Sequence, residues 1–257
     1  MDIQNFPVAI LVISFVGFWL AVVAGIHFGT RVRPLEEAER DQFVIVLTAT
    51  LTLLGLLIGF TFDMAVSRYD LRKHDEEDEA NAIGTEYLRA DLMLPSDTPK
   101  VRELLKKYLD QRISFYTISG IQPGSEPRLK ELASQTAEIQ AQMWSLVQNS
   151  ANAKATPTVA LATSGMNDVL NSQGYTQAAW WNRVPASAWL LMGAIAFCCC
   201  LLMGFGARCD RRFIKLVLPI VLSIAFFLIA DIDSPRNGII RIRPDNLRSL
   251  AQNLSRQ

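Results

Sequence analysis

Long uninterrupted apolar stretches dominate the pattern of the chain. Three of them contain no Asp, Glu, Lys or Arg, and in the fourth Lys215 is the only charged residue. The four stretches are residues 6–30, 43–62, 184–207 and 213–230. A helix needs roughly 20 apolar residues to cross the ~30 Å hydrocarbon core of a bilayer, and it satisfies every backbone amide internally. The pattern therefore predicts four membrane-spanning helices.

The spacing of these stretches predicts two hairpins that flank a polar insert. The expected parts are a first transmembrane hairpin at 1–69, a helical soluble insert at 70–182, a second transmembrane hairpin at 183–231 and a C-terminal tail at 232–257. The first stretch is longer than the roughly 7–15 apolar residues of a signal peptide, so we expect it to be a span. The predicted fold class is all-α integral membrane.

The insert is expected to be a helical bundle. Residues 98–119 repeat apolar side chains at spacings of three and four, and residues 126–149 at mixed spacings of three, four and seven, which is typical of helices with one buried face. Thr156 followed by Pro157 predicts the N-cap and first turn of a further helix. We expect Gly174 to end that helix.

Composition restricts the possible chemistry. The 25 Lys and Arg residues balance 25 Asp and Glu residues, which argues against a generally basic nucleic-acid-binding protein. The two histidines, His27 and His74, are too few for a histidine metal centre, and three of the four cysteines are consecutive at 198–200. The sequence contains no nucleophile elbow, phosphate-binding loop or dinucleotide fingerprint. We expect no metal, no cofactor and no enzymatic activity.

A run of charged residues follows the second apolar stretch. Residues 74–79 read HDEEDE, but they lack the alternating ligands and the glycine of an EF-hand. If the second span continues as a helix, Arg72 lies one turn from Glu76, and Lys73 one turn from Glu77. We interpret the run as a solvated, ion-paired face of a helix.

The second stretch also carries the candidate pore residues. Thr52, Leu56 and Phe60 recur every fourth residue and therefore share one face of a helix. In an oligomer with these helices around an axis, the three side chains would form a hydrophobic constriction. Gly55 and Gly59 form a small-residue face that allows close approach of another helix.

Asp63 directly follows the second stretch. An ionisable side chain at membrane depth is a candidate ion-interacting residue. Two structural interpretations stay open beside this one: Asp63 lies solvated at the interface, or it pairs with Arg68.

Three segments resemble known membrane proteins. GFTFDMAVSRYD, residues 59–70, is similar to the end of the second span of bestrophin anion channels, in which Gly-Phe is followed after seven residues by Arg and an aromatic residue. Gly59, Arg68 and Tyr69 match that motif. With residues 81–92 and 231–242, nearly the whole chain resembles the bacterial bestrophin-like family of unknown function.

The resemblance implies a pentamer in which the second span lines a central pore, with the insert and both termini in the cytoplasm. It also implies that Thr52, Leu56 and Phe60 are the constricting positions. Bestrophins carry an Asp-rich calcium clasp after their last span, whereas this chain has only Asp231 and Asp233 there. This departure speaks against calcium gating.

The function hypothesis is an oligomeric ion channel of the bacterial inner membrane. We expect it to pass small anions such as chloride, because the edges of the Phe60 rings carry partial positive charge. A non-conducting membrane protein whose insert binds a partner is the alternative. Basic residues are almost equally frequent on the two sides, so the expected cytoplasmic insert rests on the resemblance.

Overall fold

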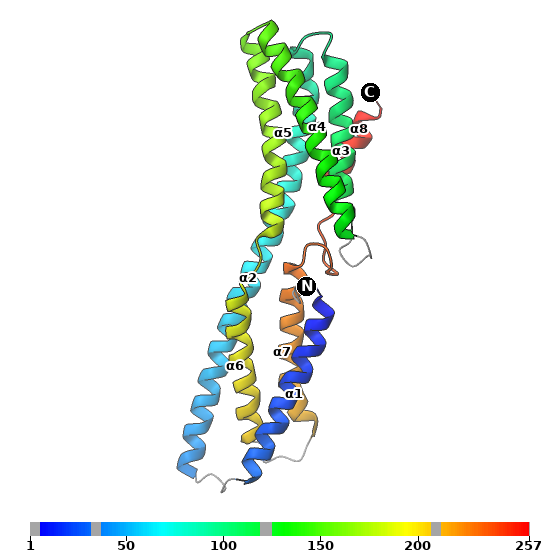
Figure 1. Ribbon diagram of the computed structural model, residues 1–257. Helices are drawn as coiled ribbons and strands as arrows, with labels where there is room; N and C mark the ends of the chain where they lie inside the picture. The colour runs from blue at the N-terminus through cyan, green and yellow to red at the C-terminus, as the bar shows by residue number, and fades with distance from the viewer. Residues whose placement is uncertain (1–5, 32–36, 119–124, 207–211, 257) are drawn as a thin grey trace. The chain divides into compact units, whose positions relative to one another are not determined.

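The computed structural model describes residues 6–31, 37–118, 125–206 and 212–256, and these form helices joined by short turns (Figure 1). The helices are α1 (Pro7–Arg31), α2 (Glu37–Arg89), the 3-10 turn η2 (Ala90–Leu92), α3 (Thr98–Thr117), α4 (Ser125–Ala153), α5 (Pro157–Trp181), α6 (Ala186–Phe205), α7 (Arg212–Asp233) and α8 (Asp245–Leu254). The described ranges contain no strand.

Four helical segments are long and apolar enough to cross a membrane, and they fall in α1, α2, α6 and α7. This confirms the predicted all-α integral membrane fold. The chain divides into two compact units. The first comprises Met1–Arg68 with Arg183–Ile240, and the second comprises Tyr69–Asn182 with Arg241–Gln257. Helix α2 contributes residues to both units.

In the first unit, α1 packs against α6 and α7. The approach of α1 to α6 is close because two glycines face each other's backbone. A Cβ added at Gly25 would lie 2.1 Å from the carbonyl oxygen of Leu201, and one added at Gly204 would lie 2.1 Å from that of Val22. Both glycines lie inside spans predicted from the sequence, and the structure shows that they allow α1 and α6 to approach closely.

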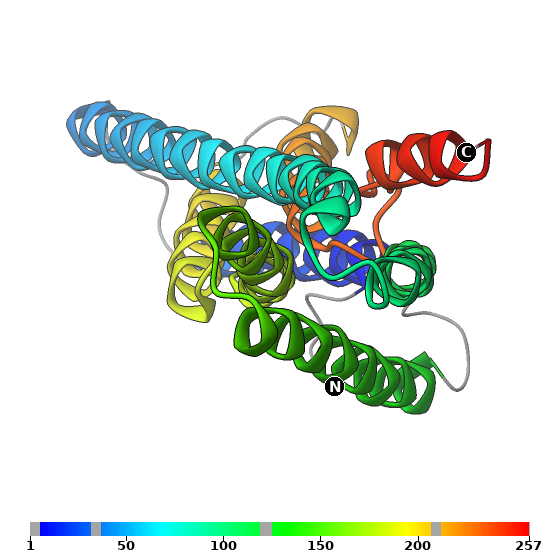
Figure 2. The same cartoon turned by 90° about the horizontal axis from the view of Figure 1, so that it is seen from above.

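In the second unit, α4 packs against both α3 and α5 (Figure 2). The core between these helices and the second part of α2 is filled by fully buried side chains such as Leu105, Met143 and Met166. Helix α8 lies within the predicted C-terminal tail, and it packs against α3 and buries Leu247 and Leu254 in the same core.

The expectation that Gly174 ends its helix is wrong. Helix α5 continues through Gly174 to Trp181. A glycine inside a helix costs about 1 kcal/mol relative to alanine, which tertiary packing readily offsets. The packing here includes Trp180, whose ring lies 4.9 Å from that of Phe115 between centroids. The predicted N-cap is confirmed, because the Thr156 hydroxyl accepts the Val159 N–H at 3.3 Å.

Candidate functional site

Most side chains of the α2 span are exposed within the first unit, and only a narrow strip is buried. Leu54 and Ala65 on one face are 1% and 0% exposed. Thr52 lies on the opposite face with Leu56, which is 53% exposed, and Phe60, which is 62% exposed. The structure thus brings the three predicted constriction residues onto one continuous face that the described residues leave exposed.

Two threonine side chains of this span, on different sides of the helix, satisfy their hydroxyl groups locally. The Thr52 hydroxyl donates to the carbonyl oxygen of Thr48 at 2.9 Å, and that of Thr50 donates to Val46 at 2.7 Å. A hydroxyl bonded in this way leaves no unsatisfied donor, so the helix can lie in an apolar environment.

The small-residue positions of α2 are not used within the described protomer. A Cβ added at Gly55 or Gly59 meets no described atom within 4 Å. An open groove of about 680 Å³ lies along the same helix, with a lining that is mainly apolar. It is lined by Val44, Ile45, Thr48, Ala49, Thr52, Leu53 and Leu56. The uncovered apolar surface of α2 is therefore available to another helix or to lipid.

Asp63 is exposed, and the structure does not pair it with Arg68. Arg68 instead lies near Asp233 at the end of α7, with 4.0 Å between Nη1 and Oδ1. Both carboxylate oxygens of Asp233 also accept the N–H of Val184, at 3.3 and 3.2 Å. Asp63 thus keeps a free approach for solvent or ions.

Asp231 folds the segment after α7 back onto the helix end. Its Oδ1 accepts the N–H of Ile239 at 2.6 Å, and its Oδ2 accepts that of Ile240 at 2.9 Å. A Cβ at Gly238 would lie 2.4 Å from the Asp231 carbonyl oxygen, so this turn requires a glycine. Each carboxylate oxygen of Asp231 thus accepts one backbone N–H, which gives this side chain a structural role in the turn.

The interpretation of the charged run as a solvated face is wrong for the inner side of α2. Arg72 is fully buried and donates to the carbonyl oxygens of Ala179 and Asn182, each at 3.0 Å, at the end of α5. Glu76, 1% exposed, accepts the N–H of Leu247 at 3.0 Å at the start of α8. These charges therefore complement the ends of two helices.

Glu79 is the third buried charge of this run. Its carboxylate forms an ion pair with Arg112 and accepts hydrogen bonds from the hydroxyls of Tyr116, at 3.3 Å, and Thr176, at 3.4 Å. Burial raises the pKa of Tyr116, and the neighbouring Glu79 carboxylate raises it further. The run keeps its predicted exposure at Lys73, His74, Glu77 and Asp78.

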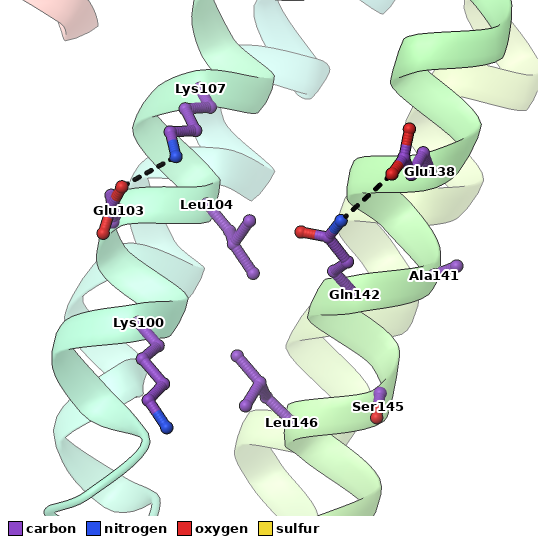
Figure 3. Close-up of a pocket in the computed structure, with 9 residues that line it drawn as sticks. All are labelled: Lys100, Glu103, Leu104, Lys107, Glu138, Ala141, Gln142, Ser145 and Leu146. Atoms are coloured by element: carbon purple, nitrogen blue, oxygen red, sulfur yellow. Dashed lines mark hydrogen bonds and ion pairs between the residues drawn. The ribbon is translucent and has the colours of Figure 1, made fainter.

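A second groove, also of about 680 Å³, lies between α3 and α4 (Figure 3). Leu104 and Leu146 form its apolar part, and two pairs of its polar side chains interact along their own helices. Lys107 pairs with Glu103 at 2.7 Å, and Gln142 donates to Glu138 at 3.5 Å. Its lining residues do not direct a set of charges at one point.

Comparison with known families gives one decisive match. The Bestrophin-like domain matches residues 14–247, which is nearly the whole chain. The chain belongs to the Bestrophin-like family. A search of curated proteins gives no match.

Solved structures share the fold of this Bestrophin-like protein. A variant of a bacterial bestrophin homologue from Klebsiella pneumoniae is 15% identical, with a TM-score of 0.64 and coverage of 97% of each chain. A variant described only as a membrane protein is 13% identical, with a TM-score of 0.67 over 95% of this chain and 97% of the other. At such identities the likeness concerns the fold.

The motif residues of this Bestrophin-like chain have three different surroundings. Gly59 is exposed on α2, and Arg68 approaches Asp233, so that two segments distant in sequence meet inside the first unit. Tyr69 belongs to the second unit and packs against the edge of its core. The pairing of Arg68 with the end of α7 could not be derived from the sequence, since helical spacing says nothing about partners on other helices.

Proposed function

We propose that this Bestrophin-like protein is an oligomeric membrane ion channel and that α2 lines its pore. The observation that supports the proposal best is the uncovered face formed by Thr52, Leu56 and Phe60, opposite the buried Leu54 and Ala65. A membrane helix that presents this face around a symmetry axis encloses a narrow apolar passage. We propose a pentamer on the basis of the family resemblance.

The constriction would control water as well as ions. Rings of Leu56 and Phe60 side chains, stacked one turn apart, exclude a stable water column when they are narrow, and an ion then loses its hydration. The ring of Thr52 lies a turn further along and is less apolar, although each hydroxyl hydrogen is bonded to the helix backbone. In this proposal the driest part of the pore is therefore at Phe60 and Leu56.

Charged side chains beyond Phe60 on α2 also act on the passing ion. Asp63 is exposed there, and the next acid, Asp70, is followed by the exposed Lys73, whereas Arg68 lies near Asp233. A ring of Asp63 carboxylates would oppose the attraction of an anion by the edges of the Phe60 rings. We propose that the pore passes small anions such as chloride and that Asp63 weakens this preference.

The direct test is reconstitution of the purified protein into bilayers with a potassium chloride gradient. We expect a reversal potential on the chloride side of zero, and we expect Asp63→Asn to move it further toward that of chloride. Asp110→Asn, which removes an exposed carboxylate from α3, is the matched control and should leave the potential unchanged.

The same experiment separates the alternatives. A wild-type reversal potential at the potassium value contradicts the proposed anion selectivity. A folded protein without conductance in either direction supports the non-conducting interaction protein. We place the insert and both termini in the cytoplasm on the family resemblance.

A further inference from the structure

Glu86 is a buried acid that forms no hydrogen bond within the described part of the chain. Its side chain on α2 is 0% exposed, and both carboxyl oxygens lack a hydrogen-bond partner among the described residues. The other buried acids of this helix differ, because Glu76 and Glu79 each accept hydrogen bonds from several donors. An unpaired carboxylate in such a place is far more costly than the neutral acid.

The space around Glu86 is built by two helices. Gly165 of α5 faces it, and a Cβ added at this glycine would lie 2.1 Å from Glu86 Oε2 and 2.5 Å from Arg89 Nη1. The carboxyl group and the guanidinium group therefore fill the volume that any other residue at 165 would occupy. The arrangement depends on the contact between α2 and α5.

Two charged groups act on Glu86 directly, Arg89 of α2 and Asp168 of α5. Burial is the main cause that raises the pKa of Glu86; the Arg89 charge lowers it and the Asp168 charge raises it, and together they bring it to about 8. Arg89 stands one turn along α2 from Glu86. Since neither Glu86 oxygen has a hydrogen-bond partner among the described residues, the two groups are near but not joined.

The charged side chains of the other helices packed in this unit interact with groups other than Glu86. Arg102 and Lys106 of α3 lie over the Tyr87 ring, at 4.9 and 5.4 Å from its centroid, and Arg102 also pairs with Asp91 of η2 at 2.8 Å. The buried residues of α4 are uncharged, and α8 meets α2 at Gly84 through the apolar Leu250.

We propose that Glu86 is a proton-binding site that makes the packing of α2 on α5 responsive to pH. At neutral pH the side chain holds its proton and stays in the apolar contact. When the proton leaves to solvent in mildly alkaline conditions, the new carboxylate attracts the Arg89 guanidinium and water, which loosens the contact at Gly165. Because the proposed function assigns the pore to α2, this site would give the insert a proton-dependent influence on that helix.

Proton linkage gives the sign of the effect on stability. The folded state has a pKa of about 8 at Glu86, against an ordinary value of 4.5, so it binds more protons than the unfolded chain between these values. Stability of the second unit therefore falls as pH rises through this window and levels off above it.

Infrared titration of the intact protein tests the site without reference to conduction. The carbonyl stretch of a protonated carboxyl should be present at about pH 6 and disappear by about pH 10. Glu86→Gln should lack this band, and Glu77→Gln, an exposed control on the same helix, should keep it. A wild-type band already absent at about pH 6, or a band that persists in Glu86→Gln, overturns the proposal.

Thermal unfolding supplies a second measurement. The unfolding temperature of the wild type should fall as pH rises from 4.5 to about 8, the two pKa values of Glu86. The unfolding temperature of Glu86→Gln should depend much less on pH in this range. Gly165→Ala places a methyl group against the Glu86 carboxyl oxygen and should also reduce the pH dependence of the unfolding temperature. Parallel pH profiles of the wild type and Glu86→Gln contradict the proposal, even if the protein conducts ions as proposed above.

Discussion

At the residue scale, the carboxylate of Glu79 organises the polar part of the second unit's core. It is 0% exposed and interacts with the guanidinium of Arg112, which is 2% exposed, and with two hydroxyl groups. A buried ion pair adds little stability compared with apolar packing, but removal of one partner leaves an uncompensated charge. The stability of the second unit therefore depends on the presence of both Glu79 and Arg112.

Replacement of Glu79 by Gln should lower the free energy of unfolding by about 3–5 kcal/mol, since Arg112 then remains buried without its counter-charge. Chemical denaturation of the purified protein in detergent measures this change. Glu77→Gln alters an exposed acid two residues away and should change stability little. Equal stability of the two variants contradicts the assigned role of the pair.

The buried charges of α2 show how far the sequence could be interpreted at this scale. Arg72, Glu76 and Glu79 share one face of the helix with Ile83, because they follow one another at spacings of three and four residues. Since Ile83 is fully buried, this periodicity could have predicted that the three charged side chains are buried too. Their partners could not be derived. Arg72 is 107 residues from Ala179, and Glu76 is 171 residues from Leu247.

At the element scale, the approach of α1 to α6 depends on glycine. Each of Gly25 and Gly204 has a backbone atom of the other helix at 2.1 Å from its added Cβ. Backbone atoms cannot turn away as a flexible side chain can, so any substitution must separate the helices. Small residues have this role wherever membrane helices pack closely.

Gly25→Ala should therefore destabilise the first unit by about 1–3 kcal/mol, the usual cost of overpacking. Gly17→Ala is the matched control in the same helix, because a Cβ there meets no described atom within 4 Å. The yield and thermal stability of the detergent-solubilised oligomer measure both effects. A Gly25→Ala protein as stable as Gly17→Ala would show that α1 and α6 do not pack as described.

The helices differ in how well the sequence predicts them. Long uncharged stretches predict the four spans because length and composition alone satisfy the requirement of the bilayer. The predicted end of α5 at Gly174 is wrong, because tertiary contacts around Trp180 override a weak local preference. Helix α8 has only 10 residues, too few for an apolar stripe to be distinguished from a loop.

At the scale of the whole molecule, the side of the membrane on which the insert lies can be tested by labelling. Ser145 is exposed on α4, whereas Ser125 is only 8% exposed and unsuitable for labelling. On a background without native cysteines, Ser145→Cys should resist impermeant thiol reagents in intact cells and react after lysis. Rapid labelling of intact cells would place the insert outside.

The candidate pore face could be predicted only in part. Helical spacing places Thr52, Leu56 and Phe60 in one line, and the structure leaves that line uncovered by its own chain. Spacing cannot show what covers the line in the assembled protein, because a pore, a lipid face and a subunit contact all require apolar side chains. The assignment of this face to the pore is the central claim of the proposed function.

Single-channel recording of Phe60→Ala tests that claim most directly. Phe60 is 62% exposed in the protomer, so its loss should leave the subunit folded and give a larger unitary conductance by widening and wetting the constriction. Leu54→Ala, on the buried face of the same helix, should instead cost about 2–5 kcal/mol of stability and reduce assembly. A folded, oligomeric Phe60→Ala protein with wild-type conductance, or with none, would contradict the assignment of this face to the pore.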